Sequence, residues 1–251
     1  MLKRLTGEQV KQYQRDGFLS PVRVMPEDTA VVLRRKIEAF EAAQGKPIHA
    51  TQRTKCSLLF PWVYDLFTSD AVLDVVEDLI GPDILHYQCG VWIKEPKAGS
   101  YVSWHQDCTY YGMDPLELVS AWVALSPATE ETGCMQVAPG SHKFGELPVE
   151  YSELNDDNLL TSGMRAQYEI DELKVVPMEL QPGEMSLHHV GVVHSSLPNH
   201  GTDRRVGIAG GYVPPHVRQT TDLLASAMLL RGEDRYGHFP LDEVPPVSPH
   251  D

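Results

Sequence analysis

The segment ILHYQCGVWIK, residues 84–94, marks a change in the pattern of the chain. Downstream of it, short runs rich in Val, Ile, Tyr and Trp are separated by Gly and Pro, a texture typical of antiparallel strands. Because no helical pattern intervenes, the arrangement favours a mainly β jelly roll or barrel over a parallel α/β sheet. We expect strands at 84–94, 101–106, 118–125, 133–138, 164–169, 173–180, 184–189 and 205–213.

Upstream of that segment the chain has the spacing of amphipathic helices. Thr6 and Gln9 form a T-x-x-Q capping box, and Gly17 is placed to end the helix that follows. Apolar residues recur at helical spacing from Pro26 to Gly45 and from Ser69 to Gly81. We therefore expect a single domain, residues 1–251, made of a mainly helical part (1–83), a jelly-roll core (84–215) and a C-terminal wrap (216–251).

Composition narrows the class of protein. The chain has 251 residues, of which 42% are hydrophobic and 22% charged, as in a globular protein. Thirty-five acidic against 21 basic residues give a net charge of −14, which disfavours nucleic acid and anionic membranes as partners. The four cysteines show no C-x-x-C spacing, and neither a targeting segment nor a long apolar run is recognisable. We expect a soluble cytoplasmic protein that acts on a small molecule.

One constellation of polar residues has the spacing of a metal site. In Trp104-His105-Gln106-Asp107, His105 and Asp107 lie two apart, so on a strand both side chains project from the same face. His194 offers a third ligand after the strand at 184–189. Two imidazoles and one carboxylate with open positions are typical of non-haem Fe(II) oxygenases. A solvent-facing pair on a strand is the alternative interpretation, and the spacing alone leaves both open.

Two adjacent arginines begin the last apolar strand. An arginine that faces a barrel interior is costly unless it meets an anion, and its planar fork suits a carboxylate. Adjacent strand residues face opposite ways, so we expect Arg205 inside and Arg204 at the solvated strand end.

Four stretches together resemble the phytanoyl-CoA dioxygenase family of Fe(II)/2-oxoglutarate-dependent oxygenases. They are WHQDCTYYG, SAWVALSPATEETGCMQVAPGSHK, PGEMSLHHVGVVHSSLPN and DRRVGIAGGYVPP, and the similarity covers roughly residues 84–215. The H-x-D pair, the G-C-x-x-x-x-P-G-S-H turn, the distal histidine and an arginine eleven residues later follow the order of that family. The resemblance implies a double-stranded β-helix of the cupin type with flanking helices.

The resemblance also implies roles for particular residues. The implied iron ligands are His105, Asp107 and His194, and the implied 2-oxoglutarate contacts are Arg205, Ser196, Trp122 and Lys94.

Other positions have competing interpretations. Gln88 and Tyr111 fall where some members contact the primary substrate, although core packing is the alternative for each. For His188 a supporting hydrogen bond is a better interpretation than ligation of the metal. The acidic stretch 145–162 is a candidate lid over the site.

The activity that the resemblance implies is an Fe(II)- and 2-oxoglutarate-dependent dioxygenase. With O2 it would hydroxylate a small, polar metabolite or natural-product intermediate and release succinate and CO2. The alternatives are a desaturating or cyclising oxygenase, a zinc hydrolase and a jelly roll that only binds a ligand. A halogenase-like enzyme is another, since WHQD and GEDRYGHF (232–239) also resemble halogenase-related sequences. Halogenases replace the carboxylate ligand with a small residue, whereas this chain keeps Asp107.

Overall fold

The computed structural model describes residues 2–48, 55–151, 157–160, 163–221 and 225–244. The helices are α1 (Gly7–Asp16), α2 (Glu27–Gln44), α4 (Pro61–Thr68), α5 (Asp70–Ile80) and α6 (Cys108–Tyr111), with 3-10 turns η1 (Cys56–Leu58) and η2 (Ser141–Phe144). The strands are β1 (Phe18–Arg23), β2 (Ile84–Lys94), β3 (Val102–His105), β4 (Met113–Asp114), β5 (Val119–Ala124), β6 (Met135–Val137), β7 (Val149–Tyr151), β8 (Met164–Ala166), β9 (Val176–Met178), β10 (Glu184–His189), β11 (His194–Ser196), β12 (Arg205–Val213), β13 (Arg218–Gln219) and β14 (Met228–Arg231).

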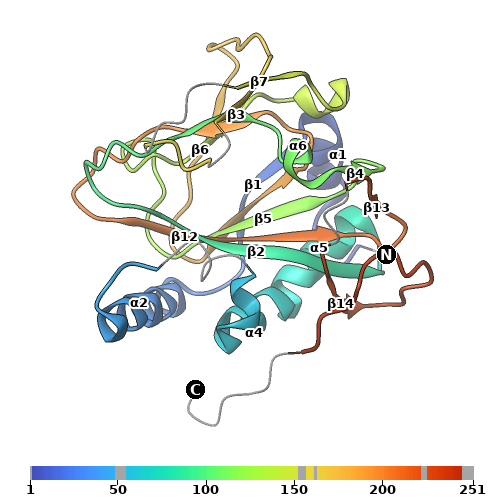
Figure 1. Cartoon of the computed structure of the whole chain (residues 1–251), viewed down its shortest axis with the longest axis horizontal. Coiled ribbons are helices and arrows are strands. Elements are labelled where there is room, and N and C mark those ends of the chain that lie inside the picture. Colours follow the sequence, from blue (N-terminus) through green and yellow to red (C-terminus); the bar gives the residue numbers. More distant parts are fainter. Residues whose placement is uncertain (1, 49–54, 152–156, 161–162, 222–224, 245–251) are drawn as a thin grey trace.

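Two antiparallel sheets form the centre of the molecule. The larger has the strand order β1-β10-β5-β12-β2-β14, and the smaller has the order β3-β11-β6-β9. In Figure 1 the smaller sheet lies over one face of the larger sheet, and α2, α4 and α5 lie on the other side. The mainly β jelly roll with flanking helices that the sequence predicts is confirmed.

Strand alternation explains why the larger sheet is buried on both faces. On β5, Ala121 and Val123 pack in a cluster with helical residues such as Val72 and Phe67. Trp122, between them, instead joins the cluster that faces the smaller sheet. Every residue of β5 is therefore buried, and the inward-facing positions are available to line a cavity.

The helix signals in the sequence are confirmed. Thr6 Oγ accepts the backbone N–H of Gln9, the Gln9 side chain accepts the N–H of Thr6, and Gly17 ends α1 with a φ of 82°. Helices α2 and α5 begin and end within a residue or two of the expected limits.

Several elements were not predicted, for identifiable reasons. Helix α4 has eight residues and mostly apolar ones, so it lacks amphipathic spacing. Strand β1 contains Pro21, which normally argues against a strand but is tolerated at the edge of a sheet. Strand β11 is the polar tripeptide His194–Ser196. The expected strands at 164–169 and 173–180 are shorter in the structure, at β8 and β9.

The expected C-terminal wrap contains β13 and β14, and β14 pairs with the edge of β2. Residues 222–224 and 245–251 of this region lie outside the described part of the chain.

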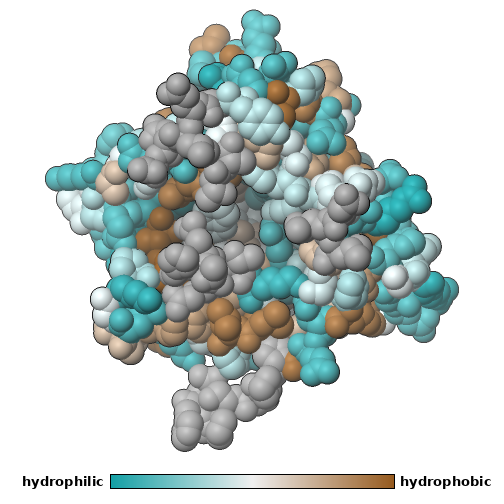
Figure 2. All heavy atoms as spheres, in the orientation of Figure 1, coloured by the Kyte–Doolittle hydropathy of each residue, from teal (hydrophilic) through white to brown (hydrophobic). Residues whose placement is uncertain are grey.

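Figure 2 shows that hydrophilic side chains cover much of the visible face, with smaller apolar groups between them. Among the described residues, no helix combines the length and apolar character needed to cross a bilayer.

Candidate metal centre and its cavity

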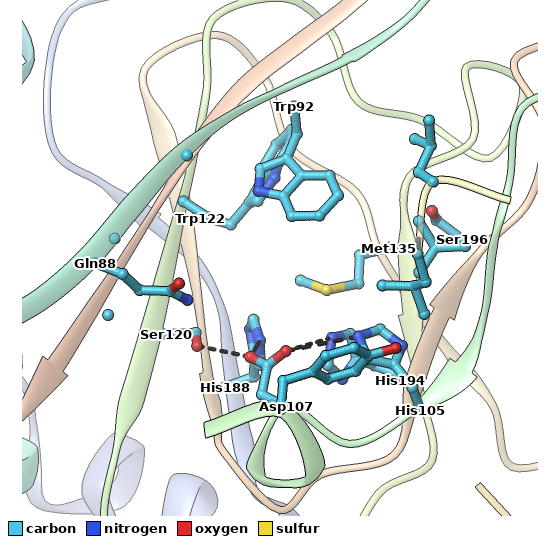
Figure 3. A pocket seen from close by; sticks show the side chains of 18 of the residues that line it. Gln88, Trp92, His105, Asp107, Ser120, Trp122, Met135, His188, His194 and Ser196 are labelled. Atoms are coloured by element: carbon cyan, nitrogen blue, oxygen red, sulfur yellow. Dashed lines mark hydrogen bonds and ion pairs between the residues drawn. The ribbon is translucent and has the colours of Figure 1, made fainter. Parts of the chain in front are cut away.

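Three side chains from the smaller sheet and its adjoining turn converge between the two sheets. His105 ends β3, His194 begins β11 directly opposite it in the pairing, and Asp107 follows β3 at the turn into α6. Oδ1 of Asp107 lies 3.6 Å from Nε2 of His105 and 3.8 Å from Nε2 of His194. One potential ligand atom from each residue lies within 4.8 Å of the others, and Figure 3 shows the three side chains facing one another.

Backbone carbonyls orient both imidazoles. Nδ1 of His105 donates to the carbonyl of Ser103 at 2.9 Å, and Nδ1 of His194 donates to the carbonyl of Val192 at 3.0 Å. A neutral ring that donates through Nδ1 carries its lone pair on Nε2, the atom that faces Asp107. Burial, followed by the neighbouring histidines, holds the pKa of His194 well below its usual value, so this ring stays neutral. The donor set therefore fits a divalent transition metal.

Two further residues hold the carboxylate of Asp107. Ser120 Oγ donates to Oδ2 at 2.9 Å, and His188 Nε2 lies 3.2 Å from the same oxygen. Burial alone would raise the pKa of Asp107, but its interactions with the neighbouring histidines His105, His188 and His194 hold it well below the usual range. These contacts leave Oδ1 directed at His105 and His194. Ser120 was not predicted, although it lies two residues before Trp122 on one strand and so shares its face.

A cavity of about 370 Å³ extends from this cluster between the sheets. Ser196, Trp122 and Arg205 line it, as do Gln88 and Tyr111, so most of the predicted site residues meet in one space. The amide of Gln88 donates to the phenol oxygen of Tyr111, which places a neutral polar pair on the wall. Burial raises the pKa of Tyr111 well above its usual value, so the phenol keeps its proton.

Arg205 is buried without a carboxylate partner among the residues that the structure describes. One guanidinium nitrogen donates to the carbonyl of Gly133 at 2.7 Å, and its central carbon lies 5.1 Å from the ring centroid of Trp122. Burial lowers the pKa of Arg205 to about 10, so the group is still a cation at neutral pH. Arg204 instead faces outward, where it pairs with Glu41 and Glu95. The two arginines face opposite ways, as expected, but Arg204 is not a solvated strand end, because its side chain is only 17% exposed and forms these ion pairs.

Lys94 is a second buried basic residue beside Arg205. The two residues are partners in the β2–β12 pairing, and the Nζ of Lys94 donates to Ser196 Oγ at 2.7 Å and to the carbonyl of Leu197. Burial, and then the charge of Arg205, lowers the pKa of Lys94 to about 6. Lys94 does not itself line the cavity, so its amino group lies behind Ser196 rather than in the open space.

The start of the candidate lid, 145–162, is fastened to the site. The amide nitrogen of Gln106 donates to the carbonyls of Gly145 and Gly191, and its oxygen accepts the N–H of Leu147. Leu159 and Leu160, at the other end, line the cavity. Residues 152–156 and 161–162 lie outside the described part of the chain, so a moving lid stays a prediction.

Comparison with known proteins places this arrangement in a family. The family model for phytanoyl-CoA dioxygenase (PhyH) matches residues 13–207. The chain belongs to this family. The family match confirms the resemblance carried by the H-x-D pair and the distal histidine.

Relatives and a solved structure agree with the family match. A probable alpha-ketoglutarate-dependent hypophosphite dioxygenase of Stutzerimonas stutzeri is 30% identical over 213 residues, covering 80% of this chain and 66% of that protein. Human peroxisomal phytanoyl-CoA dioxygenase is 26% identical over 78% of this chain and 64% of its own length. The chain thus spans less than two thirds of either relative. The apo structure of the non-heme monooxygenase ThoJ superposes with a TM-score of 0.82 at 30% identity, covering 94% of this chain and 88% of that one.

Proposed function

We propose that this chain is an Fe(II)- and 2-oxoglutarate-dependent oxygenase that hydroxylates a small molecule. The observation that carries the proposal is the pairing of two features in one cavity. The His105–Asp107–His194 cluster presents two imidazole lone pairs and one carboxylate oxygen, and Arg205 is a buried cation with no carboxylate partner among the described residues. The first suits Fe(II), and the second suits the distal carboxylate of 2-oxoglutarate.

Different side chains in the cavity would bind the metal and position its ligands. His105, Asp107 and His194 would hold the iron, which when bound supplies the oxidising chemistry that consumes 2-oxoglutarate and O2 and yields succinate and CO2. Ser120 and His188 keep one oxygen of Asp107 occupied, which orients the other toward the metal.

Arg205 would bind the co-substrate while resting on Trp122, and Ser196 would assist beside it. The amino group of Lys94, behind Ser196, would hold the Ser196 hydroxyl in place at that end of the cavity.

The cavity also indicates the kind of substrate. Apart from the metal cluster, His188 and Arg205, the side chains that line it are neutral, and they include the Gln88–Tyr111 pair. A neutral amide and a protonated phenol recognise hydroxyl or carbonyl groups without requiring a charge. A small polar metabolite or natural-product intermediate therefore fits better than a large, highly charged thioester.

The test is anaerobic reconstitution followed by turnover. Fe(II) added with 2-oxoglutarate should give a weak visible charge-transfer band that Zn(II) does not give. Admission of O2 with a panel of small neutral metabolites should then increase succinate formation for one class of compound. Metal-dependent turnover without loss of 2-oxoglutarate would instead support a zinc hydrolase, and ligand binding without either signal would support a non-catalytic jelly roll.

A further inference from the structure

Two thiols on the outer side of the larger sheet lie in contact, away from the metal cluster. Cys56 Sγ, at the start of η1, is 3.1 Å from Cys89 Sγ in β2. Both side chains are buried, with exposed fractions of 0% and 3%. The backbone N–H of Ser57 donates to Cys89 Sγ at 3.0 Å, which holds the turn against the strand. The two residues are 33 apart in sequence, so only the fold brings them together.

The surroundings keep these sulfur atoms together. Strand β2 pairs along its length with β12, and Cys89 lies opposite Gly210. Lys55, immediately before Cys56, donates from Nζ to Ser226 and forms an ion pair with Asp242 at 2.6 Å. A disulfide requires the sulfur atoms to approach to about 2.05 Å, so closure needs a movement of roughly 1 Å. The turn η1 and strand β2 thus hold the two sulfur atoms only about 1 Å farther apart than a disulfide bond requires.

A bulge in β2 gives the pair an imidazole neighbour. The pairing with β12 skips Tyr87, which brings His86 to the same face as Cys89. Burial would raise the pKa of Cys89, but the Cys56 thiol and His86 lower it below the usual value. The hydrogen bond to Cys89, followed by burial, raises the pKa of Cys56. Cys89 is thus the sulfur that reacts as thiolate, and Cys56 is the one that keeps its proton.

The two sulfur atoms lie on the helical side of the larger sheet. Cys56 and Cys89 belong to the apolar cluster that includes Phe67, whereas the adjacent Gln88 contacts Tyr111 in the cavity. Adjacent strand residues face opposite ways, so the sulfur of Cys89 points away from the cavity. A disulfide here would join η1 to β2 on the helical side and needs no group of the metal cluster.

We propose that Cys56 and Cys89 are a peroxide-sensitive dithiol that closes to a disulfide within the folded protein. The thiolate of Cys89 attacks one oxygen of hydrogen peroxide, the O–O bond breaks, and the departing hydroxide takes up a proton to become water. The sulfur of Cys56 then attacks the sulfenic acid on Cys89, and the S–S bond forms as the S–O bond breaks. The proton of the Cys56 thiol leaves with that hydroxide as a second water. Two thiols are oxidised and one peroxide is reduced.

The experiment treats the metal-free protein with hydrogen peroxide in the presence of a chelator, so its result does not depend on the proposed oxygenase activity. Intact mass should fall by about 2 Da as two thiols are lost, and dithiothreitol should reverse the change. Non-reducing peptide mapping should find Cys56 joined to Cys89. Oxygen additions without the cross-link, a link between other cysteines, or no reaction before unfolding would each overturn the proposal.

Two serine variants separate the pair from general thiol oxidation. Cys56→Ser should abolish the 2 Da loss and leave a sulfenic acid on Cys89 that dimedone traps. Cys134→Ser removes another buried cysteine and should still lose 2 Da. An unchanged 2 Da loss in Cys56→Ser would contradict the pairing. The mapping of the wild-type chain decides the question even where a variant folds poorly.

Discussion

The Nδ1–H of His194 donates to the backbone carbonyl of Val192. The lone pair of its Nε2 is therefore available to bind a metal. We expect His194→Ala to lose nearly all bound iron after reconstitution, because two donors hold a labile divalent ion poorly. Metal analysis beside the wild type is the measurement. His216→Ala is the control, since that ring lies at the surface with Glu117 and should leave the iron content unchanged. Equal iron in His194→Ala and wild type would remove His194 from the ligand set.

Arg205 and Arg204 are adjacent, yet their surroundings predict opposite consequences for 2-oxoglutarate binding. Arg205 is buried beside Trp122, whereas Arg204 pairs with Glu41 and Glu95 outside the cavity. Arg205→Ala should weaken 2-oxoglutarate binding by roughly 2 to 5 kcal/mol, or about one and a half to four decades in Kd. Arg204→Ala should change it little. Anaerobic titration of the charge-transfer band compares the two, and the reverse ranking would place the co-substrate elsewhere.

Asp107 sets the expectation for the fate of the substrate. Its carboxylate takes the coordination position that a halide would need, and its negative charge weakens attraction of a second anion to the metal. In excess chloride or bromide we expect hydroxylated or desaturated products and no halogenated ones. Mass spectrometry of the products of the wild-type enzyme is the check. A halogenated product would favour the halogenase-like alternative.

Strand β12 can carry Arg205 beside Trp122 only because residue 207 has no side chain. A Cβ at Gly207 would overlap the indole ring of Trp122, which lies on the neighbouring strand. We expect Gly207→Ala to destabilise the fold by about 1 to 3 kcal/mol and to weaken 2-oxoglutarate binding, because the displaced ring supports the guanidinium. Urea denaturation and the charge-transfer titration measure the two effects. Gly7→Ala, where a Cβ meets nothing within 4 Å, is the matched control and should be neutral or slightly stabilising.

The elements that the sequence predicted are those with a strong local signal. Helix α1 has both halves of its capping box, and β2 is eleven residues of strand-forming sequence. Strand β11 has no such signal, because its three polar residues are ordered by pairing with β3 and β6. Helix α4 is likewise fixed by packing rather than by spacing. Local pattern therefore predicted the core, and the missing elements depend on contacts between distant segments.

The candidate site divides in the same way. His105 and Asp107 were found from a spacing of two, and Arg205 from strand alternation together with the family resemblance. The contacts of Ser120 and His188 with Asp107 join residues 13 and 81 positions apart, which no local pattern encodes. The position of Lys94 behind Ser196 also depends on the register between β2 and β12.

For the molecule as a whole, the buried amino group of Lys94 couples stability to pH. The pKa of Lys94 is about 6 in the folded state against 10.5 for a free lysine, so between these values only the unfolded state holds the proton. The free energy of unfolding should therefore rise with pH in this window, by about 1.4 kcal/mol per unit from this group. Lys94→Met should lack that part of the slope. Urea denaturation of both proteins at pH 7 and pH 9 measures it, and identical slopes would show that Lys94 is charged in the fold.

The order of strands in the larger sheet determines where this chain can be truncated without loss of the fold. The family match ends at residue 207, three residues into β12, yet β12 lies between β2 and β5 and pairs with both. Truncation at the match boundary would remove most of that central strand and leave two unpaired strand edges facing each other. Exposed edges of this kind are templates for intermolecular pairing, so the shortened chain should form aggregates rather than a smaller enzyme.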